Sequence, residues 1–240
     1  MKPSSDRNAK WRVRIAFLCF SVFLIVLSVG AYFIANLGKP GIIAAPESQD
    51  LGAMTARSAN ETNAAIEKLS NEIEPATFSR HIDLGTASRS DLEALRGDLK
   101  AAEANATTFM PRYVALLEAE RNRVDNYARS IRADKDTVSR VLDGIDKRHA
   151  QTTAFTSRML TARADYYRAY QNYVDVLVSN FGAYKVANGE FIFQIQRPVD
   201  RYNSAAHAMR IAAKRVNELE EERKALIQSP QGAEQFGKVK

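Results

Sequence analysis

The sequence contains few residues of the kinds that usually carry chemistry. Among 240 residues it has one cysteine and three histidines. Cys19 has no partner for an internal disulfide, and His81, His149 and His207 have no second histidine or cysteine at the spacing of metal ligands. The motifs GxSxG and HExxH and a glycine-rich phosphate loop are also missing. We therefore expect no enzymatic activity, no cofactor and no metal site.

The sequence also lacks a strong excess of positive charge outside its first residues. It holds 34 Lys and Arg against 28 Asp and Glu, a net charge of +6. Residues 1–37 contain five of the cations and one of the anions, which leaves 29 against 27 in the rest of the chain. No later basic patch is interleaved with aromatic residues, so we expect no binding to nucleic acid.

What the sequence does contain is one long apolar segment, residues 15–37, without a charged residue, histidine or proline. Its 23 residues would make a helix roughly 34 Å long, enough to cross a hydrocarbon core of about 30 Å. Five basic residues precede it, so we expect the N-terminus to stay cytoplasmic. This predicts a single-pass protein of a bacterial inner membrane that contacts lipid through residues 15–37 and has a periplasmic C-terminal domain.

A cleaved signal peptide is the alternative interpretation of this segment. The apolar core of a signal peptide normally has about 7 to 15 residues, and the one passable cleavage site, Ile43-Ala44-Ala45, is followed by Pro46. An uncleaved anchor is therefore favoured, and cleavage stays open. The chain then divides into a basic leader (1–14), the membrane helix (15–37), a linker (38–46), an exported helical domain (47–228) and a flexible tail (229–240).

Apolar residues in the exported domain recur in alternating steps of three and four, which is typical of helices that pack in supercoils. We expect helices over 47–74, from 91 to about 131, from about 136 to 180, and over 191–227. Ser90 and Glu93 have the spacing of a capping box at the start of the second helix, and Pro111 should kink it. Polar Glu120 and Asp134 interrupt the apolar frame of Leu92, Leu95, Leu99, Ala102, Ala106, Phe109, Tyr113, Leu117, Val124, Val138, Val141, Ile145, Phe155 and Met159.

Because the frame continues across residues 91–180, one helix of about 130 Å is an alternative to two helices. A reversal at the charged segment 132–136 fits better, because the first helix is short and the chain must return beside it. The predicted fold is therefore all-α: a transmembrane helix followed by an elongated antiparallel four-helix bundle with coiled-coil character. The connections 75–90 and 181–190 would lie together at its far tip.

Aromatic residues are dense between residues 166 and 202. Tyr166, Tyr170 and Tyr173 have the spacing of core residues. Phe181, Tyr184, Phe191 and Phe193 flank the tight turn predicted at Asn188-Gly189, where both residues tolerate positive φ. Large rings at a loop tip are typical of interaction hot spots, so these four are candidate partner-binding residues. Packing of the same rings on the connection 75–90 is the alternative.

The same stretch resembles an uncharacterised family of bacterial envelope lipoproteins of unknown function. The resemblance lies in Val186-Ala187-Asn188-Gly189, Phe191, Phe193 and Tyr202-Asn203, about 30 residues in all, and the chain lacks the lipidated cysteine of those proteins. It implies an envelope location and a helical fold, and no activity.

These observations favour a membrane-anchored protein that acts by protein–protein contact, as a scaffold, a spacer or an accessory subunit of a membrane complex. The partner would be another protein or a second copy of the chain, since sustained heptads often continue onto a second chain. A sensor module that binds a small ligand between its helices and works with a separate signalling partner is the alternative.

Overall fold

The computed structural model describes residues 46–79 and 82–228. This part of the chain is mainly helical, as predicted. In chain order its elements are helix α3 (Pro46–Ser70), the short 3-10 helix η2 (Ala76–Ser79), helices α4 (Arg89–Ser130) and α5 (Lys135–Ser179), strands β1 (Tyr184–Ala187) and β2 (Glu190–Phe193), and helix α6 (Gln196–Gln228).

The predictions for the leader 1–14, the membrane helix 15–37, the linker up to residue 45 and the tail 229–240 lie outside the described residues. Among the helices that the structure describes, none combines the length and the apolar character needed to cross a bilayer.

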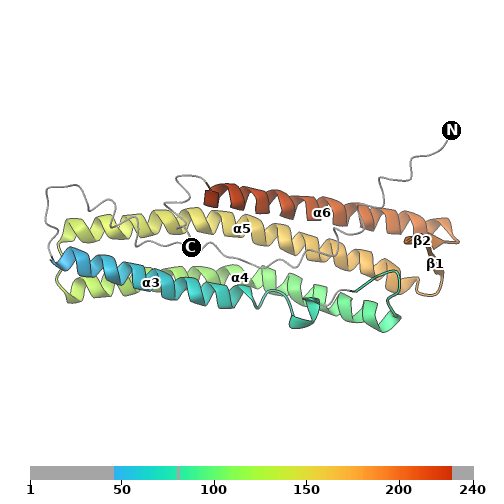
Figure 1. Ribbon diagram of the computed structural model, residues 1–240, viewed down its shortest axis with the longest axis horizontal. Helices are drawn as coiled ribbons and strands as arrows, with labels where there is room; N and C mark the ends of the chain where they lie inside the picture. Colours follow the sequence, from blue (N-terminus) through green and yellow to red (C-terminus); the bar gives the residue numbers. More distant parts are fainter. Residues whose placement is uncertain (1–45, 80–81, 229–240) are drawn as a thin grey trace.

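Helices α4 and α5 run antiparallel and form the long axis of an elongated bundle (Figure 1). Their 42 and 45 residues correspond to about 63 and 68 Å. Helix α3 packs on α4 along the half near the α4–α5 reversal, and α6 packs on α5 along the half near the β-hairpin (Figure 1). The prediction of two helices between residues 91 and 180 is confirmed, and the single continuous helix is wrong.

The reversal between α4 and α5 takes only four residues, because two capping motifs adjoin. Arg132 adopts a left-handed φ of 52°, and the Ala133 N–H donates to the Ala128 carbonyl at 3.0 Å while the Arg132 N–H donates to the Arg129 carbonyl at 3.2 Å. This pair of bonds is the Schellman motif that ends a helix. Asp134 then accepts from the Thr137 N–H at 2.9 Å and caps the start of α5.

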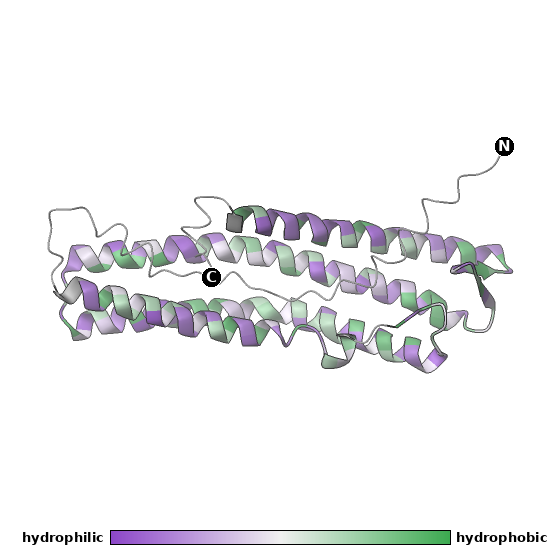
Figure 2. Ribbon diagram, viewed as in Figure 1, coloured by the Kyte–Doolittle hydropathy of each residue, from purple (hydrophilic) through white to green (hydrophobic). Residues whose placement is uncertain are grey.

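The core follows the apolar frame seen in the sequence. Every α4 position of that frame from Leu92 to Val124 is buried, as are Val141, Ile145 and Phe155 of α5. Figure 2 shows hydrophobic and hydrophilic stripes alternating along the helices, with α6 the most hydrophilic of the four. A second, smaller cluster near the reversal joins Leu51 of α3 to Val124, Ala128, Val141 and Ile145.

Two predicted helix boundaries differ from the structure. Helix α3 ends at Ser70 rather than at residue 74, and the Asn105 side chain of α4 donates to the carbonyls of Glu72 and Ile73 at 2.9 and 3.3 Å. The capping box of α4 uses Ser88 and Asp91, not Ser90 and Glu93. Both serine–acid pairs have the required spacing, and the chain becomes helical at the earlier one.

The last predicted helix begins too early. Residues 190–193 form strand β2, which pairs with β1 in an antiparallel hairpin, and α6 starts at Gln196. Asn188 and Gly189 have φ of 51° and 69°. Two successive residues with positive φ make the tight hairpin turn that suits the twist of paired strands, so the predicted turn is confirmed and its flanking strands were missed.

Candidate functional site

The four predicted tip residues gather in one aromatic cluster at the hairpin end of the bundle. The Tyr184 ring lies 5.1 Å from that of Phe191 and 5.6 Å from that of Phe193, centroid to centroid, and 6.2 Å from that of Phe181. Phe191 and Phe193 in turn contact Tyr202 of α6, at 5.6 and 5.3 Å. These edge-to-face and tilted contacts fasten the hairpin to α6.

The cluster continues into the core through Tyr173 of α5. The rings of Tyr173 and Tyr202 are 5.3 Å apart, and their hydroxyl oxygens share a hydrogen bond of 3.1 Å. Burial, aided by Tyr202, raises the pKa of Tyr173. Burial likewise raises the pKa of Tyr170 to about 12. The predicted core role of the α5 tyrosines is confirmed, since Tyr166 and Tyr173 are buried and Tyr170 is half-buried.

Most of the predicted tip residues face inward. Tyr184, Phe191 and Phe193 are half-buried, and only Phe181 is exposed, at 40%. The hairpin also lies close to the connection 75–90, which precedes α4. Gly85 of that connection is so near Val186 of β1 that a Cβ atom added to the glycine would lie 3.4 Å from Cγ1 of Val186. The rings therefore fasten the hairpin to α6. Their packing on the connection 75–90 and their binding of a partner both stay predictions.

Different residues expose apolar surface at this end. Val186, Ile192 and Ile195 are 38%, 52% and 68% exposed, and with Phe181 they are four of the five exposed large hydrophobic residues of the described chain. We call these four residues, which lie on both faces of the hairpin and beside it, the tip patch. Val186 lies opposite Phe191 on the aromatic face, whereas strand alternation turns Ile192 to the other face. Phe181 was among the predicted tip residues, but Ile192 and Ile195 were missed because residues 191–195 were assigned to a helix.

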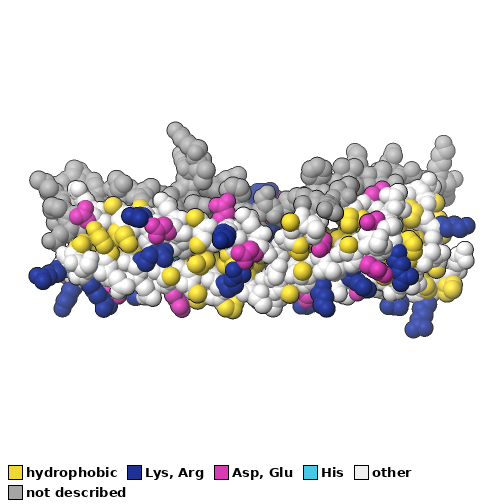
Figure 3. Space-filling view, turned by 90° about the horizontal axis from the view of Figure 1, so that it is seen from below, with side chains coloured by type: hydrophobic (Ala, Val, Ile, Leu, Met, Phe, Trp, Pro, Cys, Tyr) yellow, Lys and Arg dark blue, Asp and Glu magenta, His cyan; other side chains and the backbone are white. Residues whose placement is uncertain are grey.

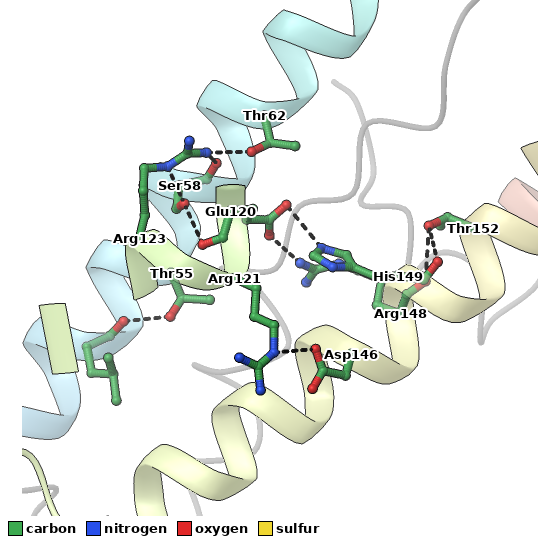
Figure 4. A network of polar contacts seen from close by, with 11 residues as sticks. Thr55, Ser58, Thr62, Glu120, Arg121, Arg123, Asp146, Arg148, His149 and Thr152 are labelled. Atoms are coloured by element: carbon green, nitrogen blue, oxygen red, sulfur yellow. Dashed lines mark hydrogen bonds and ion pairs between the residues drawn. The ribbon is translucent and has the colours of Figure 1, made fainter. Parts of the chain in front are cut away.

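A second candidate region is a buried polar cluster in the half covered by α3 (Figure 4). Glu120 of α4 is only 3% exposed, and its carboxylate accepts hydrogen bonds from Arg148 and lies 3.2 Å from Nε2 of His149. Glu120 occupies a position of the apolar frame, where a lone charge would be costly to bury. Arg148 and His149 of α5 offset that cost, and Arg148 is always cationic.

Arg123 of α4 ties α3 to the same region (Figure 4). Its guanidinium donates to the Ser58 hydroxyl at 3.0 Å, to the Ser58 carbonyl at 3.3 Å and to the Thr62 hydroxyl at 2.6 Å. Ser58 and Thr62 are buried, as is Thr55 one turn earlier. The contact between α3 and α4 is therefore polar at its centre.

The cavity beside Glu120 is small. It holds about 20 Å³ and is lined by α3, α4 and α5, including Asn63, Tyr113 and Thr152. That volume suits one water molecule. Burial lowers the pKa of Arg148, while Glu120 acts in the opposite direction. Chemically the cluster is a satisfied ion pair with room for a single water.

The three histidines have different surroundings. His207 is exposed, His81 lies outside the described residues, and His149 is half-buried beside Glu120. The pairing of His149 with Glu120 was not foreseen, because Glu120 lies 29 residues away in the sequence and on the neighbouring helix. In residues 46–79 and 82–228 no three His, Cys, Asp or Glu side chains converge as metal ligands would.

The chain matches no protein-family model, no curated protein and no solved structure.

Proposed function

We propose that the chain is a membrane-anchored envelope protein that acts by protein–protein contact, with residues 15–37 as its anchor and a periplasmic four-helix bundle of coiled-coil character as its working part. The observation that carries this proposal is the tip patch. Large apolar residues exposed together at one end of a molecule favour an interaction site, whereas scattered ones are ordinary. Of the five that the described residues expose, four lie within residues 181–195, on both faces of the hairpin and beside it.

The position of the tip patch supports the proposal. The first residues of α3 lie at the end of the bundle where α4 reverses into α5, and the hairpin lies at the other end (Figure 1). An anchor preceding α3 would therefore hold the tip patch about 60 Å from the membrane, judged from the 42 residues of α4. That arrangement suits a spacer or scaffold. The resemblance to envelope lipoproteins is in keeping with the same location.

Photo-crosslinking tests this function. A photoreactive residue at Ile195 of the full chain, expressed at its natural level, should give one discrete crosslinked protein, and Ile195→Ser with the probe moved to Ile192 should weaken that crosslink. The control probe replaces Ala104, an exposed residue of α4. Equal crosslinking from both sites, or none from either, would contradict contact through the tip.

A ligand-binding sensor is the second candidate. Its support is the bundle architecture, in which ligands commonly bind between helices. The enclosed cavity at Glu120 suits only water, so a metabolite would have to open it. Thermal-shift screening of the full chain against small metabolites separates the two functions, because reproducible stabilisation favours sensing.

A further inference from the structure

Helices α4 and α5 leave a groove between them on the surface. It has a volume of about 580 Å³, and no residue of α3 or α6 is among its lining residues. Its α4 wall is formed by Met110, Val114 and Leu117, and its α5 wall by Ala150, Thr153 and Ala154. The groove is therefore a feature of the α4–α5 pair alone.

The shape of the groove follows from its side chains. On α4 the lining positions recur at i, i+4 and i+7, so they share one helix face. The facing α5 residues Ala150 and Ala154 are short and exposed, which leaves the space empty. Both walls extend over 12 residues, 110–121 and 146–157, which is about 18 Å or three helical turns. A third helix of three turns fits such a seam between two helices.

One end of the groove is acidic. Arg121 is paired with Asp146 at 2.8 Å. Exposed Glu118 also lines this end, and the lining contains no second arginine that could balance its charge. The hydrogen bond that Arg121 donates to Asp146 raises the pKa of Arg121, and the charges of Asp125 and Asp143 add to that effect. Asp125 is itself bound by Arg129 at 2.7 Å. At the other end, Met110 and Ser157 carry no charge.

Figure 3 shows another aspect of the surface. Along the face drawn there, hydrophobic, basic and acidic side chains are interspersed.

We propose that this groove binds a three-turn amphipathic helix of another protein, with aliphatic residues against Met110, Val114 and Leu117 and with Lys or Arg at the end near Glu118 and Asp146. This surface is separate from the tip patch. It extends the proposed contact function, and a negative result here leaves the tip crosslink unaffected.

The probe is a designed helical peptide of about 14 residues, with leucines at i, i+4 and i+7 and two lysines at one end. Fluorescence anisotropy measures its binding to the purified full chain. We expect saturable binding that Ala154→Arg weakens at least about tenfold, because the longer side chain fills the groove. Glu118→Lys should weaken the lysine peptide several-fold and favour a second peptide with glutamates in place of the lysines.

Ala101→Arg and Glu67→Lys are the matched controls, since both positions are exposed and lie outside the groove. They should leave binding unchanged. Absence of saturable binding, or binding that Ala154→Arg leaves intact, overturns the proposal. So does a dimer of the full chain in light scattering that Ala154→Arg dissociates, because the occupant would then be a second copy.

Discussion

At the scale of single residues, Glu120 is the clearest departure from an apolar core. Its carboxylate is buried between α4 and α5 and is satisfied by Arg148 and His149. A buried ion pair adds little net stability, but removing one partner leaves the other charge uncompensated.

Glu120→Ala should therefore lower the free energy of unfolding by about 3–5 kcal/mol, because Arg148 would remain buried without its carboxylate. Replacing Glu120, Arg148 and His149 together by leucine should cost less than the single change. Urea denaturation measures both, with Glu118→Ala as an exposed control expected within about 0.5 kcal/mol of wild type. A triple variant less stable than Glu120→Ala would refute this account.

Arg132 offers a stabilising substitution. It holds a left-handed φ of 52° at the end of α4, a conformation that favours glycine. Arg132→Gly should raise the unfolding free energy by about 1 kcal/mol. Thermal melts check this, with Asn126→Gly, an exposed position inside α4, expected to destabilise instead. Loss of stability in Arg132→Gly would show that its side chain matters more than its backbone.

Part of this residue-level detail could be predicted from the sequence. The polar interruption at Glu120 was visible in the apolar frame, but its partners were not, because the α4–α5 register that brings residue 120 to residues 148 and 149 depends on packing along both helices. The choice of Ser88 as the capping residue of α4 was not predictable either. The pairs Ser88–Asp91 and Ser90–Glu93 have the same spacing, and spacing alone does not decide which pair caps the helix.

At the scale of elements, α3 is held differently from α5. Its contact with α4 contains buried Thr55, Ser58 and Thr62, with Arg123 donating three hydrogen bonds across the interface. At this polar centre the contact depends on the Arg123 guanidinium, while Leu51, Ile66 and Leu69 pack the two ends of α3 into the hydrophobic core.

Arg123→Ala should therefore loosen α3 while leaving α4 and α5 intact. We expect faster hydrogen–deuterium exchange over residues 50–70, and unchanged exchange in α5, because local opening costs less than global unfolding. Arg89→Ala, which removes an exposed pair with Glu93 at 3.0 Å, is the control. Uniform acceleration across all helices would mean that α3 does not open separately.

The helices were predictable from their period, and the hairpin was not. The α4 and α5 patterns persist for more than ten turns, so errors at their ends matter little. Residues 184–193 form strands of four residues each, too short to set a period of two against the helical spacing of Phe191, Ile195 and Val199. Only the Asn188-Gly189 turn was recognisable.

At the scale of the whole molecule, buried tyrosines should make the free energy of unfolding decrease at alkaline pH. Burial raises the pKa of Tyr170 to about 12 and raises those of Tyr166, Tyr167 and Tyr173 in the same direction. In the unfolded chain these groups ionise near pH 10. Their contribution to stability is thus complete below about pH 10 and is lost as pH rises through the folded-state values.

Above about pH 10, the unfolding free energy should fall by about 1.4 kcal/mol per pH unit for each such tyrosine. Urea titrations from about pH 8 to 11 measure the slope, and ultraviolet difference absorbance follows tyrosinate formation. Tyr170→Phe should reduce the slope by one tyrosine's share. Ionisation of every tyrosine near pH 10 in the folded chain would contradict the burial.

The order of contacts along the chain has a consequence for how the protein folds. Helices α3, α4, α5 and α6 each contact the next helix in sequence, and only four residues separate α4 from α5. Closing so short a loop costs little entropy, and a topology of sequence neighbours forms rapidly. We expect the α4–α5 pair to form first, and α3 and α6 to pack onto it afterwards.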